Sequence, residues 1–172
     1  IVLPEIRQGD MSDLPREARQ LVRADRVHAK MVEADLWRDG LQAYLAATSF
    51  ADAQVGRVLA ALEESPRRDR TIVVLVSDHG WHLGEKGHWR KATLWQPSTH
   101  IPLVIVPPGY VHPGATCSRP VEALSIFATL CDLAGLPTPE HVEGPSLVPL
   151  LDDPQAEWSH LALTTYRNYN HS

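Results

Sequence analysis

Hydrophobic residues recur at steps of three and four over residues 40–64, which predicts an amphipathic helix there. Residues 71–77 and 101–106 are apolar, β-branched runs without alternation, typical of strands that are covered on both faces, as in a parallel sheet. A second helical pattern spans 125–134, and Gly135 follows where a left-handed C-terminal cap is expected. This succession of helices and strands predicts an α/β fold.

The remaining segments carry weaker patterns. Residues 1–38 are polar and uneven, and we interpret them as a loop followed by a helix within 15–30. Asp39 is placed to cap the helix at 40–64. A short helical turn is expected over 147–151, and a strand over 161–166.

The long segment between the two predicted strands, residues 78–100, has no clean helical period. In open α/β sheets, the segments that leave the carboxyl ends of strands form the ligand crevice. Long loops of this kind more often carry a function than serve only as connections. We therefore expect the functional site in residues 78–100.

Composition excludes several classes of protein. The chain has 172 residues, enough for one domain with a core, and its 16 Lys and Arg against 21 Asp and Glu give a net charge of −5. That balance gives no electrostatic support for binding nucleic acid. The longest uncharged apolar run, 71–77, is far below the roughly 20 residues of a membrane helix. We expect neither nucleic acid nor a membrane as a partner.

The two cysteines, Cys117 and Cys131, are too few for a disulfide framework or a four-ligand zinc site. Free thiols are the expected state. Histidine is more informative, because several of the nine lie within residues 79–100.

Asp78 and His79 come directly after the first predicted strand. A turn at that position brings a carboxylate and an imidazole onto one divalent cation, and Gly80 lets the backbone turn sharply behind them. An isolated Asp-His pair would more often be a turn cap with a surface histidine. The position at a strand end, before a long loop, favours a metal site.

Other residues of the segment are candidates for binding an oxyanion. Lys91 and Arg90 supply positive charge, although adjacent side chains seldom both point inward, and we interpret Arg90 as solvated. Three tryptophans could exclude water from such a site: Trp81, Trp89 and Trp95. Three histidines are each better interpreted as structural: His82, His88 and His100.

The pattern as a whole resembles the type I sulfatases, particularly the iduronate-2-sulfatase-like branch of the alkaline phosphatase superfamily. The central motif is Asp78-His79-Gly80-Trp81, Gly84-Glu85, Gly87, Trp89 and Lys91, followed by Thr99-His100-Ile101-Pro102-Leu103. Residues 44–59, 121–135 and 137–151 are similar to the family's segments on either side, so the resemblance runs from about Leu41 to the end of the chain.

The resemblance implies a mainly parallel, alkaline-phosphatase-like sheet flanked by helices, and hydrolysis of a sulfate monoester from a small molecule or glycan. In that family a formylglycine made from cysteine attacks sulfur, while Ca²⁺ and basic side chains hold the sulfate oxygens. Asp78 and His79 map onto two metal ligands, and Lys91 onto a catalytic lysine that contacts the sulfate. Family members are often exported, so a periplasmic, extracellular or lysosomal location is implied.

The family's nucleophile motif, Cys-x-Pro/Ala-x-Arg, is not found in this chain. Cys117 is followed by Ser-Arg-Pro-Val and Cys131 by Asp-Leu-Ala-Gly. The first residue is Ile1 rather than Met. We therefore expect residues 1–155 to be the later part of a catalytic domain and 156–172 the start of a smaller C-terminal subdomain, with the nucleophile and further metal ligands upstream. Alone, the chain is expected to be inactive.

Two other interpretations stay open at this point. The same Asp-His pair suits a metal-dependent phosphomonoesterase or phosphodiesterase with a Ser or Thr nucleophile. Alternatively, the chain is a non-catalytic α/β module that binds a partner through exposed core surface.

Overall fold

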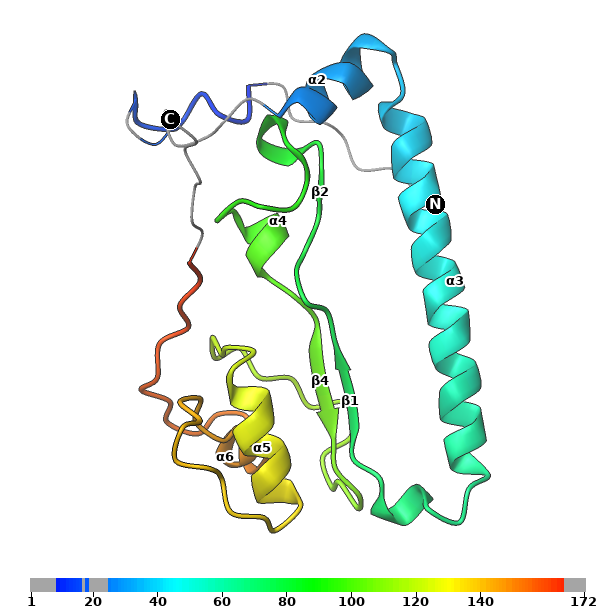
Figure 1. Cartoon of the computed structure of the whole chain (residues 1–172), viewed down its shortest axis with the longest axis vertical. Coiled ribbons are helices and arrows are strands. Elements are labelled where there is room, and N and C mark those ends of the chain that lie inside the picture. The colour runs from blue at the N-terminus through cyan, green and yellow to red at the C-terminus, as the bar shows by residue number, and fades with distance from the viewer. Residues whose placement is uncertain (1–8, 17, 19–24, 166–172) are drawn as a thin grey trace. The chain divides into compact units, whose positions relative to one another are not determined.

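The computed structural model describes residues 9–16, 18 and 25–165 (Figure 1). The chain divides into two compact units. The first contains the described residues up to Pro66 together with Val76–Leu103, and the second contains Arg67–Leu75 and Val104–Thr165.

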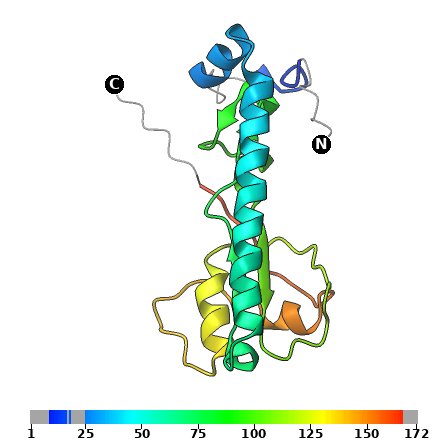
Figure 2. The ribbon, with the colours of Figure 1, turned by 90° about the vertical axis from the view of Figure 1, so that its right-hand side faces the viewer.

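Two helices open the first unit: α2 (Arg26–Glu33) and α3 (Trp37–Glu63). α3 is one uninterrupted helix (Figure 2) that covers residues 40–63 of the predicted 40–64, but it begins earlier than expected. Its N-cap position is Leu36, so the expectation of an Asp39 cap is wrong. Asp39 lies in the first turn instead, where a carboxylate still interacts favourably with the helix dipole.

A small hairpin lies beside the start of α3. It consists of β2 (His82–Leu83) and β3 (Trp89–Arg90), which pair antiparallel with His82 opposite Arg90, and the 3₁₀ turn η2 (Glu85–Gly87) joins them. The indole N–H of Trp37 donates to the Leu83 carbonyl. The Trp89 ring packs so closely on Gly40 that a β-carbon there would collide with it. These contacts fix the hairpin to α3.

The longer strands are β1 (Val73–Val76), which follows the 3₁₀ turn η1 (Arg68–Arg70), and β4 (Leu103–Val106). They pair with each other. The N–H of Ser77, just after β1, donates to the carbonyl of Pro102, just before β4. The end of one strand therefore adjoins the start of the other, and this pair is antiparallel (Figure 1). The unalternated runs are strands as predicted, but the parallel arrangement does not apply to this pair.

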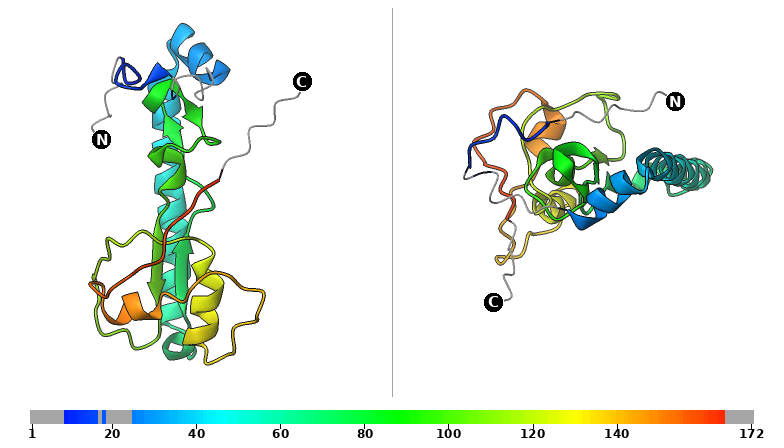
Figure 3. Two further views of the ribbon diagram at one scale, coloured as in Figure 1. Left: turned by 90° about the vertical axis from the view of Figure 1, so that its left-hand side faces the viewer. Right: turned by 90° about the horizontal axis from the view of Figure 1, so that it is seen from above.

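The second unit has its core around α5 (Ser125–Leu133) and α6 (Val148–Asp152). Thr129 is fully buried, and its hydroxyl donates to the Ser125 carbonyl and accepts from the Leu147 N–H. Gly135 has φ +67° and ends α5, as the sequence predicts. The long connection from β4 to α5 is irregular (Figure 3). The apolar core residues are Ile105, Ala128, Leu147 and Leu150.

Two predictions at the chain's ends have different outcomes. Residues 161–165 form no strand, so that expectation is wrong for the part of 161–166 that the structure describes. The helix expected within 15–30 falls partly outside the described residues, and α2 begins near its end. None of the helices described here is both long and apolar enough to cross a membrane.

Several apolar side chains of β1 and β4 are exposed. Leu75 is 44% exposed, Val76 42%, Val104 47% and Val106 41%. Strands with unalternated apolar runs normally have both faces covered. Within the described residues, this pair therefore retains uncovered apolar surface.

The buried hydroxyl of Thr129 provides a test of the second unit's packing. Thr129→Val keeps the shape but leaves the Leu147 N–H without its acceptor, at an expected cost of about 1–3 kcal/mol in the free energy of unfolding. Thr129→Ser keeps the acceptor and is the control. Urea unfolding measures both, and equal stability of the valine variant and the wild type would contradict the assignment.

Candidate functional site

Asp78 and His79 leave the end of β1 through a tight turn. The Ser77 hydroxyl donates to the His79 carbonyl at 2.8 Å, and the Gly80 N–H donates to the Ser98 carbonyl at 2.8 Å. A β-carbon on Gly80 would collide with the Pro97 carbonyl. Glycine is required because the backbone approaches α4 (Gln96–Thr99) directly, which aims the two preceding side chains.

The hydrogen bonds of His79 indicate which ring nitrogen faces the site. Nδ1 lies 2.9 Å from the Gly80 carbonyl, and a carbonyl can only accept. A neutral His79 therefore carries its proton on Nδ1 and presents the lone pair of Nε2. Nε2 lies 3.5 Å from Asp78 Oδ2, and the Asp78 side chain is 84% exposed. The Asp78 carboxylate and His79 Nε2 therefore lie on the same side of the turn.

Lys91 follows β3 directly and meets this pair beside the start of β2. Its Nζ donates to His79 Nε2 at 2.7 Å, across twelve positions of sequence. The structure thus brings together all three predicted site residues, a carboxylate, an imidazole and an ammonium. Such a set can bind a divalent cation and an oxyanion side by side.

The three tryptophans have different roles. Trp81 stacks on His79 with ring centroids 6.2 Å apart, and on its other side Tyr44 of α3 stacks at 6.3 Å. Trp89 is buried in the hairpin core, and the Trp95 ring lies 5.4 Å from Lys86 Nζ. Of the three, Trp81 is the one that these contacts place against the site.

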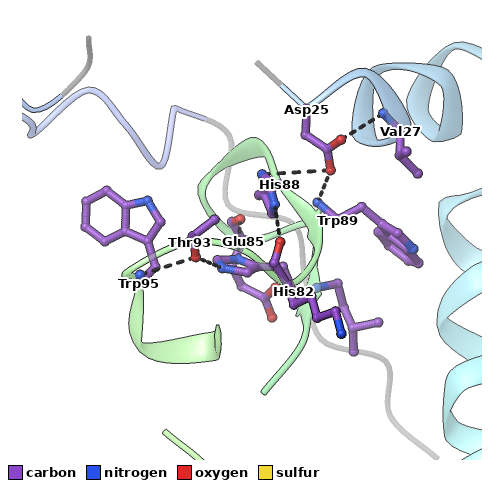
Figure 4. Close-up of polar contacts among 10 residues, drawn as sticks. Asp25, Val27, His82, Glu85, His88, Trp89, Thr93 and Trp95 are labelled. Atoms are coloured by element: carbon purple, nitrogen blue, oxygen red, sulfur yellow. Dashed lines mark hydrogen bonds and ion pairs between the residues drawn. The ribbon is translucent and has the colours of Figure 1, made fainter. Parts of the chain in front are cut away.

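The histidines interpreted as structural behave as such where they are buried (Figure 4). His82 is fully buried, its Nδ1 donates to the Glu85 carbonyl at 3.1 Å, and its Nε2 accepts from the Thr93 hydroxyl at 2.8 Å. Burial lowers the pKa of His82, and the neighbouring His88 lowers it further, against the opposing effect of the Glu85 carbonyl. His100 and the Arg90 side chain are exposed.

Two carboxylates that the sequence does not single out anchor the hairpin. Asp25 caps α2 through the Val27 N–H at 2.9 Å and also accepts from the Trp89 N–H at 2.6 Å. Asp10 accepts from the Lys86 N–H at 2.8 Å and pairs with Lys86 Nζ at 3.0 Å. The partners lie 64 and 76 positions apart, so no local pattern indicates them; only the cap signal of an Asp before a helix marks Asp25.

The backbone around Lys91 adopts an unusual conformation. Arg90 and Ala92 have φ values of +81° and +73°, in the left-handed region that costs a non-glycine residue roughly 1–2 kcal/mol. Residues held in such conformations cluster at functional sites, where surrounding contacts maintain them.

The donor set that the chain offers to a metal is small. Among residues 9–16, 18 and 25–165, no three His, Cys, Asp or Glu side chains are gathered. Asp78 and His79 fit as two ligands of a shared site, because a hard oxygen and the Nε2 lone pair face the same side. Cys117 and Cys131 are free thiols, as expected.

The comparison with known proteins identifies the class. The sulfatase family model matches residues 8–136, and the chain belongs to the sulfatase family. The α/β fold class is confirmed by solved sulfatase structures of the alkaline phosphatase superfamily.

Individual relatives agree with this class. The chain is 37% identical over its whole length to a sulfatase of Formosa agariphila, of which it covers 34%. It is 34% identical to human iduronate 2-sulfatase over 67% of this chain and 25% of that protein. A structure solved in complex with its substrate D-glucosamine-2-N,6-O-disulfate matches with a TM-score of 0.69 at 30% identity, over 90% of this chain and 31% of that one. The chain thus spans about a quarter to a third of these proteins.

The lowered pKa of His82 predicts a pH dependence of stability. The unfolded chain takes up a proton at His82 near pH 6.5 and the folded chain only at lower pH, so the folded state binds fewer protons between these values. Stability should therefore fall as pH drops below about 6.5, and level off below the folded pKa. Urea unfolding across this range should show a flatter profile for His82→Gln.

His100→Gln, which removes an exposed imidazole, is the control. An equal flattening in both variants would contradict the assignment to His82.

Proposed function

We propose that the protein to which this chain belongs hydrolyses a sulfate monoester, with Lys91 holding the sulfate group. The observation that supports this most is the convergence of Asp78 Oδ2 and Lys91 Nζ on His79 Nε2, at 3.5 and 2.7 Å. Membership in the sulfatase family supports the same reaction.

Lys91 supplies the positive charge in this proposal. Sulfuryl transfer develops negative charge on the sulfate and leaving-group oxygens, and an ammonium group positioned beside these oxygens stabilises that charge in the transition state. Lys91 carries three N–H donors, so it can turn one toward a sulfate oxygen without moving its backbone. Trp81, stacked between His79 and Tyr44, excludes water from one side of this contact.

We propose Asp78 and His79 as two ligands of a divalent cation, with Ca²⁺ as the candidate. A bound divalent cation would polarise the sulfate and neutralise its charge. Nε2 of His79 has a single lone pair, which in this structure accepts from Lys91. Ligation at Nε2 and donation from Lys91 are therefore alternatives, and Lys91 would donate to the sulfate once Nε2 serves as a ligand.

The nucleophile is proposed to be a formylglycine outside this chain. Neither Cys117 nor Cys131 precedes the Pro/Ala-x-Arg pattern, and Cys117 Sγ accepts a hydrogen bond from the Arg119 N–H within its own loop. For the substrate, we propose a sulfated sugar. The support is that one structural relative was solved with D-glucosamine-2-N,6-O-disulfate as its substrate.

The proposed roles of Lys91 and Asp78 can be separated by experiment. In the whole protein that carries this chain, Lys91→Ala should lower kcat/KM for an aryl sulfate by about 10²–10³ while leaving Ca²⁺ binding by calorimetry no weaker. Asp78→Asn should weaken Ca²⁺ binding itself. Arg90→Ala, next to Lys91 but solvated, is the control. Full activity of Lys91→Ala would contradict the proposal.

The choice between sulfate and phosphate esters is tested on the same protein. We expect kcat/KM for para-nitrophenyl sulfate to exceed that for para-nitrophenyl phosphate, and treatment with a chelator to abolish activity until Ca²⁺ is restored. A preference for the phosphate ester, with Zn²⁺ or Mn²⁺ restoring activity better, would select the phosphoesterase alternative instead.

A further inference from the structure

The segment that delivers Lys91 to the site needs an external support. Lys91 lies between two non-glycine residues in the left-handed region, Arg90 and Ala92, and its own side chain is exposed. A disfavoured backbone on an exposed turn relaxes unless other groups hold it. The hydrogen bonds around this turn show which groups do so.

His88 holds this turn through a hydrogen bond to the backbone. Its Nε2 donates to the Lys91 carbonyl at 3.0 Å, which fixes the peptide unit between the two residues with positive φ. The His88 ring meets the fully buried His82 edge-on, with ring centroids 5.0 Å apart. The imidazole is therefore itself held in one orientation.

Asp25 lies on the other side of His88 (Figure 4). Its Oδ2 lies 3.8 Å from His88 Nδ1, and the two side chains are only 12% and 15% exposed. This Nδ1 is buried and has no hydrogen-bond partner, so the carboxylate is its polar neighbour. The same Oδ2 accepts from the Trp89 N–H, and Oδ1 caps α2 at Val27.

We propose that Asp25 and His88 act together as positioning residues for Lys91. Asp25 holds the backbone at Trp89 and His88 holds it at Lys91, so the chain is clamped on both sides of Arg90. With its backbone fixed, the Lys91 side chain reaches His79 Nε2 in one geometry. This inference rests on the proposed function of Lys91 as the sulfate-binding group. It adds that two residues of this chain, Asp25 and His88, determine the position of Lys91.

The chain offers a matched control in Asp10. Asp10 and Asp25 each accept a backbone N–H of the same hairpin, at Lys86 and Trp89 respectively, with similar side-chain exposures of 19% and 12%. Asp25 faces His88 and Asp10 pairs with Lys86 instead. Comparing Asp25→Asn with Asp10→Asn therefore separates positioning of Lys91 from general anchoring of the hairpin.

The test uses the whole protein that carries this chain and two readouts. The first is kcat/KM for an aryl sulfate. We expect His88→Ala and Asp25→Asn to lower it about 10- to 100-fold, because misplacement of a binding group by about 1 Å costs up to about 100-fold. His88→Gln, whose amide nitrogen can replace Nε2 as donor to the Lys91 carbonyl, should recover most of the loss. Asp10→Asn should leave it near the wild-type value.

The second readout does not depend on activity. Trace acetylation followed by mass spectrometry compares the modification of Lys91 with that of the exposed Lys30. A lysine amino group held against His79 is less free to attack the reagent than a fully solvated one. The ratio of Lys91 to Lys30 acetylation should therefore rise several-fold in His88→Ala and Asp25→Asn, and not in Asp10→Asn.

Any of three results would overturn the proposal. These are an unchanged acetylation ratio in His88→Ala, an equal loss of kcat/KM in Asp10→Asn and Asp25→Asn, and a kcat/KM in His88→Gln as low as in His88→Ala. If the wild-type protein does not cleave sulfate esters but the acetylation pattern holds, the proposed function fails and the positioning of Lys91 stands. Thermal unfolding of each variant confirms that it is folded. Should Asp25→Asn not fold, the His88→Ala and His88→Gln pair decides the outcome.

Discussion

The hydrogen bond between His79 Nδ1 and the Gly80 carbonyl determines the chemistry of the whole site. It commits the ring proton to Nδ1 and leaves the Nε2 lone pair facing Asp78 and Lys91. Gly80 makes this geometry possible, because its backbone lies directly against Pro97 and Ser98. This turn and the hairpin that follows it thus place a carboxylate, an ammonium group and an aromatic ring around one imidazole.

The position of the candidate site along the chain could be predicted from sequence because Asp78 and His79 carry a local signal. Asp78 and His79 follow an unalternated apolar run, and such a run predicts both a strand and the place where it ends. The family resemblance, rather than a local pattern, points to Lys91, and its Nζ lies 2.7 Å from His79 Nε2. The helix ending at Leu133 and the left-handed Gly135 were likewise predictable, since helix caps have local sequence signatures.

The supports of the site could not be predicted in the same way. Asp25 and Asp10 contact the hairpin across 64 and 76 positions, and a single sequence does not encode such pairs as a pattern. α3 begins at Trp37 and not after Asp39. The Trp37 indole donates to the Leu83 carbonyl, so this tertiary contact outweighs the capping preference of Asp39. The direction of β4 relative to β1 depends on the loop between them, which has no periodicity to interpret.

The Asp25 carboxylate couples the local unfolding of α2 to that of β3. The same group satisfies the first turn of α2 and the backbone of β3, so neither element can detach without leaving a buried carboxylate short of a donor. Local unfolding proceeds in cooperative units defined by such shared contacts. The amide protons of α2 and of the Trp89 segment should therefore exchange with solvent as one unit, and the order of the proposed sulfate-binding turn is coupled to the integrity of a helix far from it in sequence.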